Sequence, residues 1–439
     1  MMLLLIIFLL TLERRGGRSQ FVGMPSWMRA IRHSSHLAIR CFCMKPPLKE
    51  DLNAILCRQI RSAGPISVAE YMKIAMHHPV HGYYTNFSVL GPDGDFITSP
   101  EISQIFGEIL GIWIVNEWMK YSKNAPFDIV ELGPGRGTLM ATVIKALCKF
   151  PTGSSLFRHL YFVERSDRLR ELQKSVISPI LKTYCIKPEL SWHSSLDEIP
   201  GGCVTFYLAN EFFDALPIHR FQQVDNDWRE VFVSVMGPSN PVESGDQLAF
   251  VTSPSSTIAA STYLPLAGDL SDKNCVEICP EAGAILQKIA SRIATDGGSA
   301  LISDYGHLGE CGDTLRAFKD HKLHDPLKDP GQADITADVD FAFLRRSVEA
   351  IKEPVIFHGP VSQAYFLVHM GILLRLKVLV ERTTSEEDKK RLIAATEMLI
   401  GSNQMGKRFK FMALTPGRSE KEKEHIPAGF YPTWDTDKA

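Results

Sequence analysis

A glycine loop is the part of the sequence best suited to chemistry: residues 131–137 read Glu-Leu-Gly-Pro-Gly-Arg-Gly. An apolar run precedes the loop and a helical pattern follows it. It therefore lies at a strand-to-helix turn, where glycines let the backbone approach a ligand closely. Gly133, Gly135 and Gly137 are spaced G-x-G-x-G, whereas the dinucleotide fingerprint G-x-G-x-x-G would need a glycine where Thr138 stands. The spacing disfavours a dinucleotide, and an ordinary tight turn is the alternative to a binding site.

Two acidic residues stand at the ends of the strands around this loop. Glu131 ends the first strand directly below the glycines, and Glu164 ends the next apolar run. A carboxylate below the loop suits a ligand with an ammonium group, and the second acid stands where a ribose diol would lie. Ammonium, ribose and adenine together describe S-adenosylmethionine. We therefore predict a site for this methyl donor, with Leu196 beside the adenine and Asn210 facing the donor.

A second group of acids follows the fourth predicted strand, in Asn-Glu-Phe-Phe-Asp-Ala-Leu-Pro at 210–217. Glu211 and Asp214 bracket two phenylalanines, an arrangement that can hold a planar cation between acids and rings. An arginine guanidinium has a pKa above ~12, so its methylation needs carboxylates that orient it and accept its proton. These two residues are the predicted catalytic acids. The alternative is that Glu211 caps the next helix and the phenylalanines belong to the core.

The loop that precedes the clearest helix also carries polar residues. Thr98, Ser99 and Glu101 stand just before the apolar helical pattern, with Ser99 as the expected N-cap. We interpret this loop as a lid over the donor and Glu101 as a further acceptor contact; a solvated capping turn is the alternative. His77, His78 and His81 lack a carboxylate or cysteine at ligand spacing, so no metal site is predicted.

Short apolar runs alternate with amphipathic helices from residue 126 onward, which predicts a mainly parallel sheet with helices on both faces. The expected strands are 127–132, 160–164, 189–192, 203–209, 299–304, 354–358 and 408–414. About 90 residues separate the fourth strand from the fifth, far more than a crossover needs. HRFQQV and WREVFVSV flank Asp-Asn-Asp like a hairpin there, which indicates a β-containing insertion at about 215–297.

Composition and charge give the rest of the organisation. The 439 residues carry a net charge of −2, so nothing steers the molecule as a whole toward nucleic acid. Residues 1–45 are expected to be a mitochondrial transit segment because they are rich in arginine and poor in acids. Their apolar start leaves a secretory signal as the alternative and is too short to span a bilayer. The expected parts that follow are an N-terminal helical cap with the lid loop (46–125), a methyltransferase domain (126–415) and a charged tail (416–439).

Six motifs in order resemble the MidA-like family. They are HPVHGYYT (78–85), GDFITSPEISQIFGE (94–108), ELGPGRG (131–137), YFVERSDRLRELQ (161–173), NEFFDALP (210–217) and GPVSQAYFLVHMGI (359–372). The glycine loop and the acid at the next strand end are also similar to the first two motifs of class I methyltransferases. The two resemblances imply a seven-stranded Rossmann-like methyltransferase fold.

The family resemblance also implies a particular activity. The mitochondrial member of the family is a protein arginine methyltransferase that assists assembly of respiratory complex I. The resemblance therefore implies symmetric dimethylation, in the matrix, of an arginine in a core subunit of the complex I peripheral arm, with S-adenosylmethionine as donor. A non-catalytic assembly chaperone that keeps the fold is the main alternative, and a nicotinamide-dependent oxidoreductase is a weaker one. The sequence leaves the oligomeric state open.

Overall fold

The computed structural model describes residues 51–85, 98–121, 125–237, 246–417 and 426–431. The predicted transit segment at 1–45 lies outside the described residues, as do the first part of the expected lid loop and most of the expected tail.

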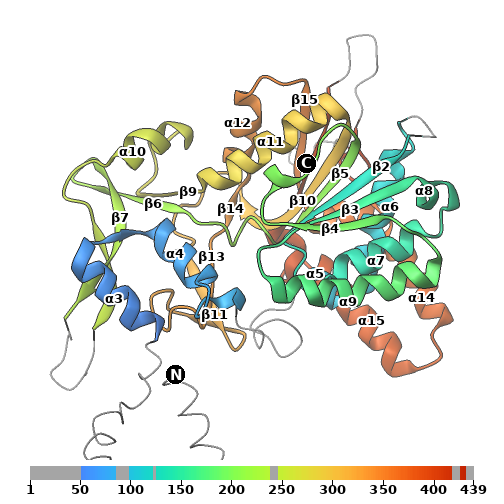
Figure 1. Ribbon diagram of the computed structural model, residues 1–439, viewed down its shortest axis with the longest axis horizontal. Coiled ribbons are helices and arrows are strands. Elements are labelled where there is room, and N and C mark those ends of the chain that lie inside the picture. The colour runs from blue at the N-terminus through green and yellow to red at the C-terminus, as the bar shows by residue number, and fades with distance from the viewer. Residues whose placement is uncertain (1–50, 86–97, 122–124, 238–245, 418–425, 432–439) are drawn as a thin grey trace, which may run out of the picture. The chain divides into compact units, whose positions relative to one another are not determined.

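The central sheet has the spatial order β15-β16-β10-β5-β2-β3-β4 (Figure 1), with β14 paired to β10. Its strands are β2 (Phe127–Leu132), β3 (Phe157–Val163), β4 (Glu189–His193), β5 (Val204–Asn210), β10 (Gly298–His307), β14 (Val339–Asp340), β15 (Val355–Ser362) and β16 (Phe409–Pro416). The seven expected segments all fall on strands of this sheet. The expected count was one too low, because β14 has two residues and leaves no readable pattern in the sequence.

Most neighbouring strands of this sheet run parallel, and β16 is the exception, since it pairs antiparallel with both β10 and β15. The chain runs from β2 outward through β3 to β4 and then returns to β5, on the other side of β2. This reversal leaves a crevice at the carboxyl ends of β2 and β5, which is where open α/β sheets bind ligands. The glycine loop follows β2 and the acidic segment at 210–217 follows β5, so the topology brings the two predicted motifs together.

Helices cover both faces of the sheet (Figure 1). One face carries α6 (Gln104–Trp118), α7 (Thr138–Leu147), α9 (Asp167–Tyr184), α13 (Gln363–His369), α14 (Ile372–Arg382) and α15 (Glu386–Ile400). The other face carries α11 (Pro280–Asp296) and α12 (Phe341–Ala350). All six residues of β2 are buried, as a strand covered on both faces requires. The shorter helices are α8 (Pro151–Leu156), α10 (Ile258–Tyr263), α16 (Met405–Arg408), η4 (Leu196–Glu198) and η5 (Leu264–Leu266).

The helix expected from Ser99 onward is broken into two. A four-residue helix, α5 (Ser99–Ile102), precedes α6, and Ser103 interrupts them with an extended backbone while capping α6 through its hydroxyl. Ser99 is not the N-cap: Thr98 holds that position without a side-chain cap bond. The Ser99 hydroxyl donates to the carboxylate of Glu211. A residue expected to cap the start of a helix therefore contacts Glu211, one of the predicted catalytic acids.

The β-containing insertion is shorter than expected. It consists of β6 (His219–Val224), β7 (Asp227–Met236), β8 (Gln247–Thr252), α10 and β9 (Cys275–Ile278), whereas α11 packs on the central sheet as the crossover to β10. The expected hairpin is present between β6 and β7, and its two turn residues, Asp225 and Asn226, both have positive φ. The insertion therefore ends near residue 279 instead of 297.

The region expected as one helical cap, 46–125, divides between two cores. Its first part comprises α3 (Leu52–Ala63), β1 (Ile66–Ser67), α4 (Val68–His77) and η2 (Tyr83–Thr85). β1 pairs with β7 of the insertion, and the two helices pack in a hydrophobic cluster with β7 and β13. Its second part, α5 and α6, lies on the central sheet. The division follows from the alternating pattern of β7, which buries one face against the α3–α4 segment.

The chain leaves the central sheet a second time, between β10 and β14. It forms a three-stranded sheet of β11 (Arg316–Lys319), β12 (Lys322–His324) and β13 (Asp334–Thr336) in the order β12-β11-β13. These strands, which have three or four residues each, are too short to be expected from the sequence. Ala317 of β11 and Ile335 of β13 join the cluster of α3, α4 and β7.

The described part of the expected tail is packed instead of solvated. The side chain of Phe430 is 7% exposed in the core, and the indole of Trp113 donates to the carbonyl of Ala428 at 3.2 Å. The charge run at 418–425 lies outside the described residues. Within the described ranges, no single helix is long and apolar enough to cross a membrane, and the pair α13 and α14 passes that test only as two helices bent by 66°.

Candidate functional site

A cleft of about 1070 Å³ opens at the carboxyl ends of β2, β3, β4 and β5. Nine of the ten predicted site residues line it: Glu101, Glu131, Gly133, Gly135, Glu164, Leu196, Asn210, Glu211 and Asp214. Gly137 does not line the cleft, because it begins α7 as a left-handed N-cap. The predicted donor and acceptor residues therefore share one cavity.

The glycine loop shows why side chains are excluded from it. Gly133 and Gly135 both have positive φ, at 62° and 51°. A Cβ atom on Gly133 would come within 2.6 Å of the ring of Phe212, whereas one on Gly135 would meet nothing within 4 Å. Gly133 thus allows close packing against the acceptor segment, and Gly135 leaves open space at the cleft for a ligand.

Glu131 lies under this loop as a buried acid. Its side chain is 2% exposed, and its Oε2 atom has no hydrogen-bond partner among the described residues. Burial raises the pKa of Glu131 to about 8. A buried carboxylate with an unsatisfied oxygen is stabilised by a cationic group, which an ammonium would supply.

Glu164 and Gln173 connect the donor side of the cleft. The Oε1 atom of Glu164 accepts from the backbone N–H of Ser166 at 2.8 Å, and its Oε2 accepts from Gln173 at 3.2 Å. Gln173 also donates to the carbonyl of Gly135 at 2.8 Å and accepts from the indole of Trp192. Burial raises the pKa of Glu164, and these hydrogen bonds oppose the shift. Gln173 thereby fixes the glycine loop, the second acid and β4 relative to one another.

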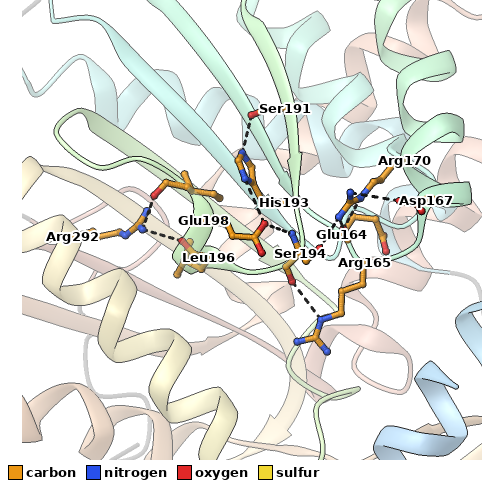
Figure 2. Close-up of polar contacts among 11 residues, drawn as sticks. Glu164, Arg165, Asp167, Arg170, Ser191, His193, Ser194, Leu196, Glu198 and Arg292 are labelled. Carbon is orange, nitrogen blue, oxygen red and sulfur yellow. Dashed lines mark hydrogen bonds and ion pairs between the residues drawn. The ribbon is translucent and has the colours of Figure 1, made fainter. Parts of the chain in front are cut away.

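The loop after β4 is held by arginines from two helices (Figure 2). Arg292 of α11 donates to the carbonyls of Leu196 and Ile199 at 2.9 and 2.8 Å. Arg170 of α9 donates to the hydroxyl of Ser194 in this loop at 3.0 Å, and also to the carbonyl of Glu164 after β3. Leu196, 5% exposed, is thus presented as an apolar wall at the position predicted for an adenine.

Glu211 is the first acid of the acceptor side, which is the segment that follows β5. Its backbone has φ of 51°, an uncommon conformation for a residue other than glycine that is often found at functional sites. Its Oε1 atom accepts from the backbone N–H and the hydroxyl of Ser99, both at 2.8 Å, and from Asn210 at 3.3 Å. Oε2 has no partner among the described residues. Burial raises the pKa of Glu211 to about 7, and the Ser99 bonds oppose this.

Asp214 is the second acid of this side and is 7% exposed. Its Oδ1 atom has no hydrogen-bond partner among the described residues. Burial raises the pKa of Asp214 to about 6, and the side chain of Tyr305 and the charge of Arg316 oppose the shift. Arg316 is itself paired with Asp338 at 2.5 Å and lies 5.0 Å from the ring centroid of Tyr305.

Asp304, within β10, organises the acceptor segment. Its Oδ2 atom accepts from the backbone N–H groups of Phe212, Phe213 and Asp214 at 3.1, 2.9 and 3.3 Å. Its Oδ1 accepts from the N–H of Tyr305 at 3.0 Å. Burial and the neighbouring acids raise the pKa of Asp304, and the N–H donors oppose them. This role could not be expected from the sequence, since each contact spans about ninety residues of chain.

Glu101 and the histidines complete the cleft wall. Glu101 lies 4.0 Å from the Arg136 side chain of the glycine loop, and burial raises its pKa. Of the three histidines, only His77 lines this cleft, and burial together with Arg165 lowers its pKa to about 4. Among the described residues no group of three His, Cys, Asp or Glu side chains could hold a metal ion.

Three features define a Rossmann-like methyltransferase: a cleft where the strand order reverses, an open glycine loop and a buried acid beneath that loop. A family model described as "putative S-adenosyl-L-methionine-dependent methyltransferase" matches residues 109–361, and the chain belongs to this family. The cofactor is S-adenosyl-L-methionine. The residues of the donor side fit it, because the unpaired Oε2 of Glu131 suits its ammonium group and the space over Gly135 is open.

Relatives with curated names are similar over most of the chain. The identity is 44% over 378 residues to the mitochondrial protein arginine methyltransferase NDUFAF7 of Homo sapiens, which covers 82% of each chain. It is 44% over 424 residues to the mitochondrial NDUFAF7 homolog of Drosophila melanogaster, covering 90% of this chain and 95% of that protein.

A solved structure has the same fold. A Burkholderia thailandensis protein bound to S-adenosyl-homocysteine superposes with a TM-score of 0.69 at 24% identity, covering 91% of this chain and 96% of that one. The likeness extends the fold assignment beyond the residues matched by the family model.

Proposed function

We propose that this chain is a protein arginine methyltransferase that symmetrically dimethylates an arginine in a core subunit of the complex I peripheral arm and so supports complex I assembly. The observation that carries the arginine part is the pair of buried acids after β5. Glu211 Oε2 and Asp214 Oδ1 both lack hydrogen-bond partners in the described structure, and both line the cleft that contains the donor loop. The name of the human relative supports the same substrate class.

The two acids suit a guanidinium in charge and in hydrogen bonding. A guanidinium has five N–H donors in one plane and carries a fixed positive charge. When bound, S-adenosyl-L-methionine supplies a methyl group on a cationic sulfur, which becomes a neutral thioether once the methyl is lost. Glu211 and Asp214 would orient the attacking nitrogen toward that methyl group and localise the positive charge on the far nitrogens. With a pKa raised to about 7, Glu211 is suited to take the proton that the nitrogen loses.

The activity can be separated from a chaperone role by filling the donor space. Gly135→Asn places a side chain in the open region, at a left-handed position that asparagine tolerates. Gly371→Asn is the matched control, because Gly371 is also left-handed with nothing within 4 Å and does not line the cleft. We expect Gly135→Asn to abolish binding of S-adenosyl-homocysteine and Gly371→Asn to retain it.

Both variants are then expressed in cells that lack the protein, and arginine methylation of the peripheral-arm subunits is measured by mass spectrometry. The proposal requires that methylation and complex I assembly return with Gly371→Asn but not with Gly135→Asn. Full assembly with a folded Gly135→Asn protein would favour the chaperone. Methylarginine found in only the monomethyl or asymmetric form would refute the symmetric product.

A further inference from the structure

One wall of the cleft is separate from both the glycine loop and the acidic segment after β5. It is formed by η2, which belongs to the HPVHGYYT segment, and by β13 of the three-stranded sheet. Tyr84 of η2 and Asp334 and Thr336 of β13 all line the same cleft as Glu211 and Asp214. We propose that Asp334 is a third carboxylate of the acceptor pocket and that Tyr84 is its aromatic wall, so that the pocket selects a planar guanidinium. The inference rests on the proposed arginine substrate.

The backbone ties β13 directly to the acidic segment. The N–H of Ala337, just after β13, donates to the carbonyl of Asp214 at 3.0 Å. β13 is also paired with β11, where Phe318 lies opposite Asp334. Asp334 is therefore carried by a strand that is hydrogen-bonded on one side and joined at its end to a catalytic acid. Its position relative to Asp214 is fixed by backbone contacts and not by a loose loop.

Tyr84 is also held in place. Its ring stacks on His77 of α4 at 5.5 Å and meets the ring of Tyr83 edge-on at 5.4 Å. Burial raises the pKa of Tyr84 well above its usual value, and the negative charges of Asp334 and Asp214 raise it further. Tyr84, Asp334 and Asp214 all line the same cleft.

The chemistry of this wall matches a guanidinium better than an ammonium. A guanidinium can donate in several in-plane directions while its face lies against an aromatic ring. The unpaired oxygens of Glu211 and Asp214 provide two acceptors, and Asp334 adds a carboxylate from a separate element, β13. The positive charge of Arg316, near Asp214, is balanced by its pairing with Asp338. A lysine ammonium is a compact point charge and gains less from carboxylates presented by separate elements.

The test measures acceptor binding apart from catalysis. Full-length protein saturated with S-adenosyl-homocysteine is titrated with methylguanidinium chloride and with methylammonium chloride, and binding is followed by ligand-observed NMR. We expect the wild type to bind methylguanidinium more tightly than methylammonium. Asp334→Asn should weaken methylguanidinium binding by about tenfold, as expected for loss of a charge-assisted contact. Its affinity for S-adenosyl-homocysteine should remain within about twofold of the wild type, which also reports that it is folded.

Asp320→Asn is the matched control. Asp320 is an exposed acid of the same three-stranded sheet, at the turn between β11 and β12, and does not line the cleft. It has positive φ, a conformation that asparagine accepts. This variant should bind both probes like the wild type. If it weakens methylguanidinium as much as Asp334→Asn does, the loss is a general charge effect and the inference is refuted.

Two further outcomes separate this inference from the proposed function. Unchanged methylguanidinium binding in Asp334→Asn, together with its loss in Asp214→Asn, would refute the role of Asp334 and leave the arginine substrate intact. A wild type that binds S-adenosyl-homocysteine but not methylguanidinium would overturn both. If Asp334→Asn does not fold, Tyr84→Leu decides: retained donor affinity with weaker methylguanidinium binding supports the pocket, and unchanged binding refutes it.

Discussion

Glu131 is the residue whose protonation should report donor binding. Because its pKa is about 8 in the ligand-free protein, its carboxyl group is protonated at pH 6.5. An ammonium beside it favours the ionised form and lowers that pKa. We therefore expect binding of S-adenosyl-homocysteine at pH 6.5 to release close to one proton, measured by titration calorimetry in buffers of different ionisation enthalpy. Glu131→Gln should release almost none, and equal release by both proteins would contradict this role.

The same buried acid should lower the stability of the ligand-free protein. Its pKa rises from 4.5 in the unfolded chain to about 8 in the folded one, so the folded state holds more protons between these values and loses stability as the pH rises through this window. We expect Glu131→Gln to be more stable than the wild type at pH 8, on the order of 4 kcal/mol. At pH 4.5 to 5 the two should be nearly equal. Urea unfolding without ligand at both pH values measures this, and a variant less stable at pH 8 would contradict it.

Asp304 should act through the backbone it holds. Asp304→Ala leaves the N–H groups of Phe212, Phe213 and Asp214 without their acceptor, so the acidic segment should shift and methyl transfer should fall by about 100-fold. Asp304→Asn keeps one acceptor oxygen and should restore most of the activity. Labelled methyl transfer into mitochondrial extract from cells lacking the protein measures the rate. Affinity for S-adenosyl-homocysteine should stay unchanged, and full activity in a folded alanine variant would contradict the role.

The sequence predicted the residues that stand at strand ends and missed those that act across the fold. Glu131, Glu164, Glu211 and Asp214 could be found because a buried strand ends beside each one. Gln173, in the middle of α9, looks like any polar helix position; only the closeness of α9, the glycine loop and β4 reveals its hydrogen bonds. Periodicity carries no information on such long-range partners.

At the scale of elements, α4 should stabilise the insertion and the three-stranded sheet more than the central sheet. Met72 of α4 is fully buried in the cluster that contains Val233 of β7 and Ile335 of β13. Met72→Ala should cost about 2–5 kcal/mol of unfolding free energy. Hydrogen exchange should accelerate in β7 and β13 before it does in β2 and β5.

Met119→Ala is the control for this prediction, because Met119 follows α6 and is 54% exposed. A substitution at such a position should change stability by less than about 0.5 kcal/mol. Equal acceleration of exchange in all strands of Met72→Ala would show that the two cores unfold together, against the prediction.

Long buried strands and the hairpin could be predicted from the sequence, whereas short elements could not. Strands β11 to β14 have two to four residues, too few for a pattern of alternation. The break at Ser103 was missed because the apolar spacing continues through it, and the hydrogen bond from Ser99 to Glu211 that accompanies it is a tertiary contact. The element boundaries that were predicted wrongly are those where tertiary packing overrides the local preference of the sequence.

For the whole molecule, charge is unevenly distributed along the chain. Residues 1–49 contain eight basic residues and one acid, a net charge of +7, which leaves −9 for the remainder. We expect residues 1–49 fused to a fluorescent protein to enter the mitochondrial matrix, since arginine-rich, acid-poor leaders direct import. Protease protection in isolated mitochondria, with and without rupture of the outer membrane, measures the location. Secretion of the fusion would contradict the expectation.

The position of β16 has a consequence for how the enzyme matures. This strand comes last in the chain among those of the central sheet, yet it lies inside the sheet between β10 and β15. The ribosome synthesises the donor loop before this strand, which completes the sheet. A nascent chain that lacks β16 therefore exposes the open edges of β10 and β15, which favours aggregation. Premature stop codons upstream of residue 409 should therefore give a chain that is degraded, and not a folded enzyme of lower activity.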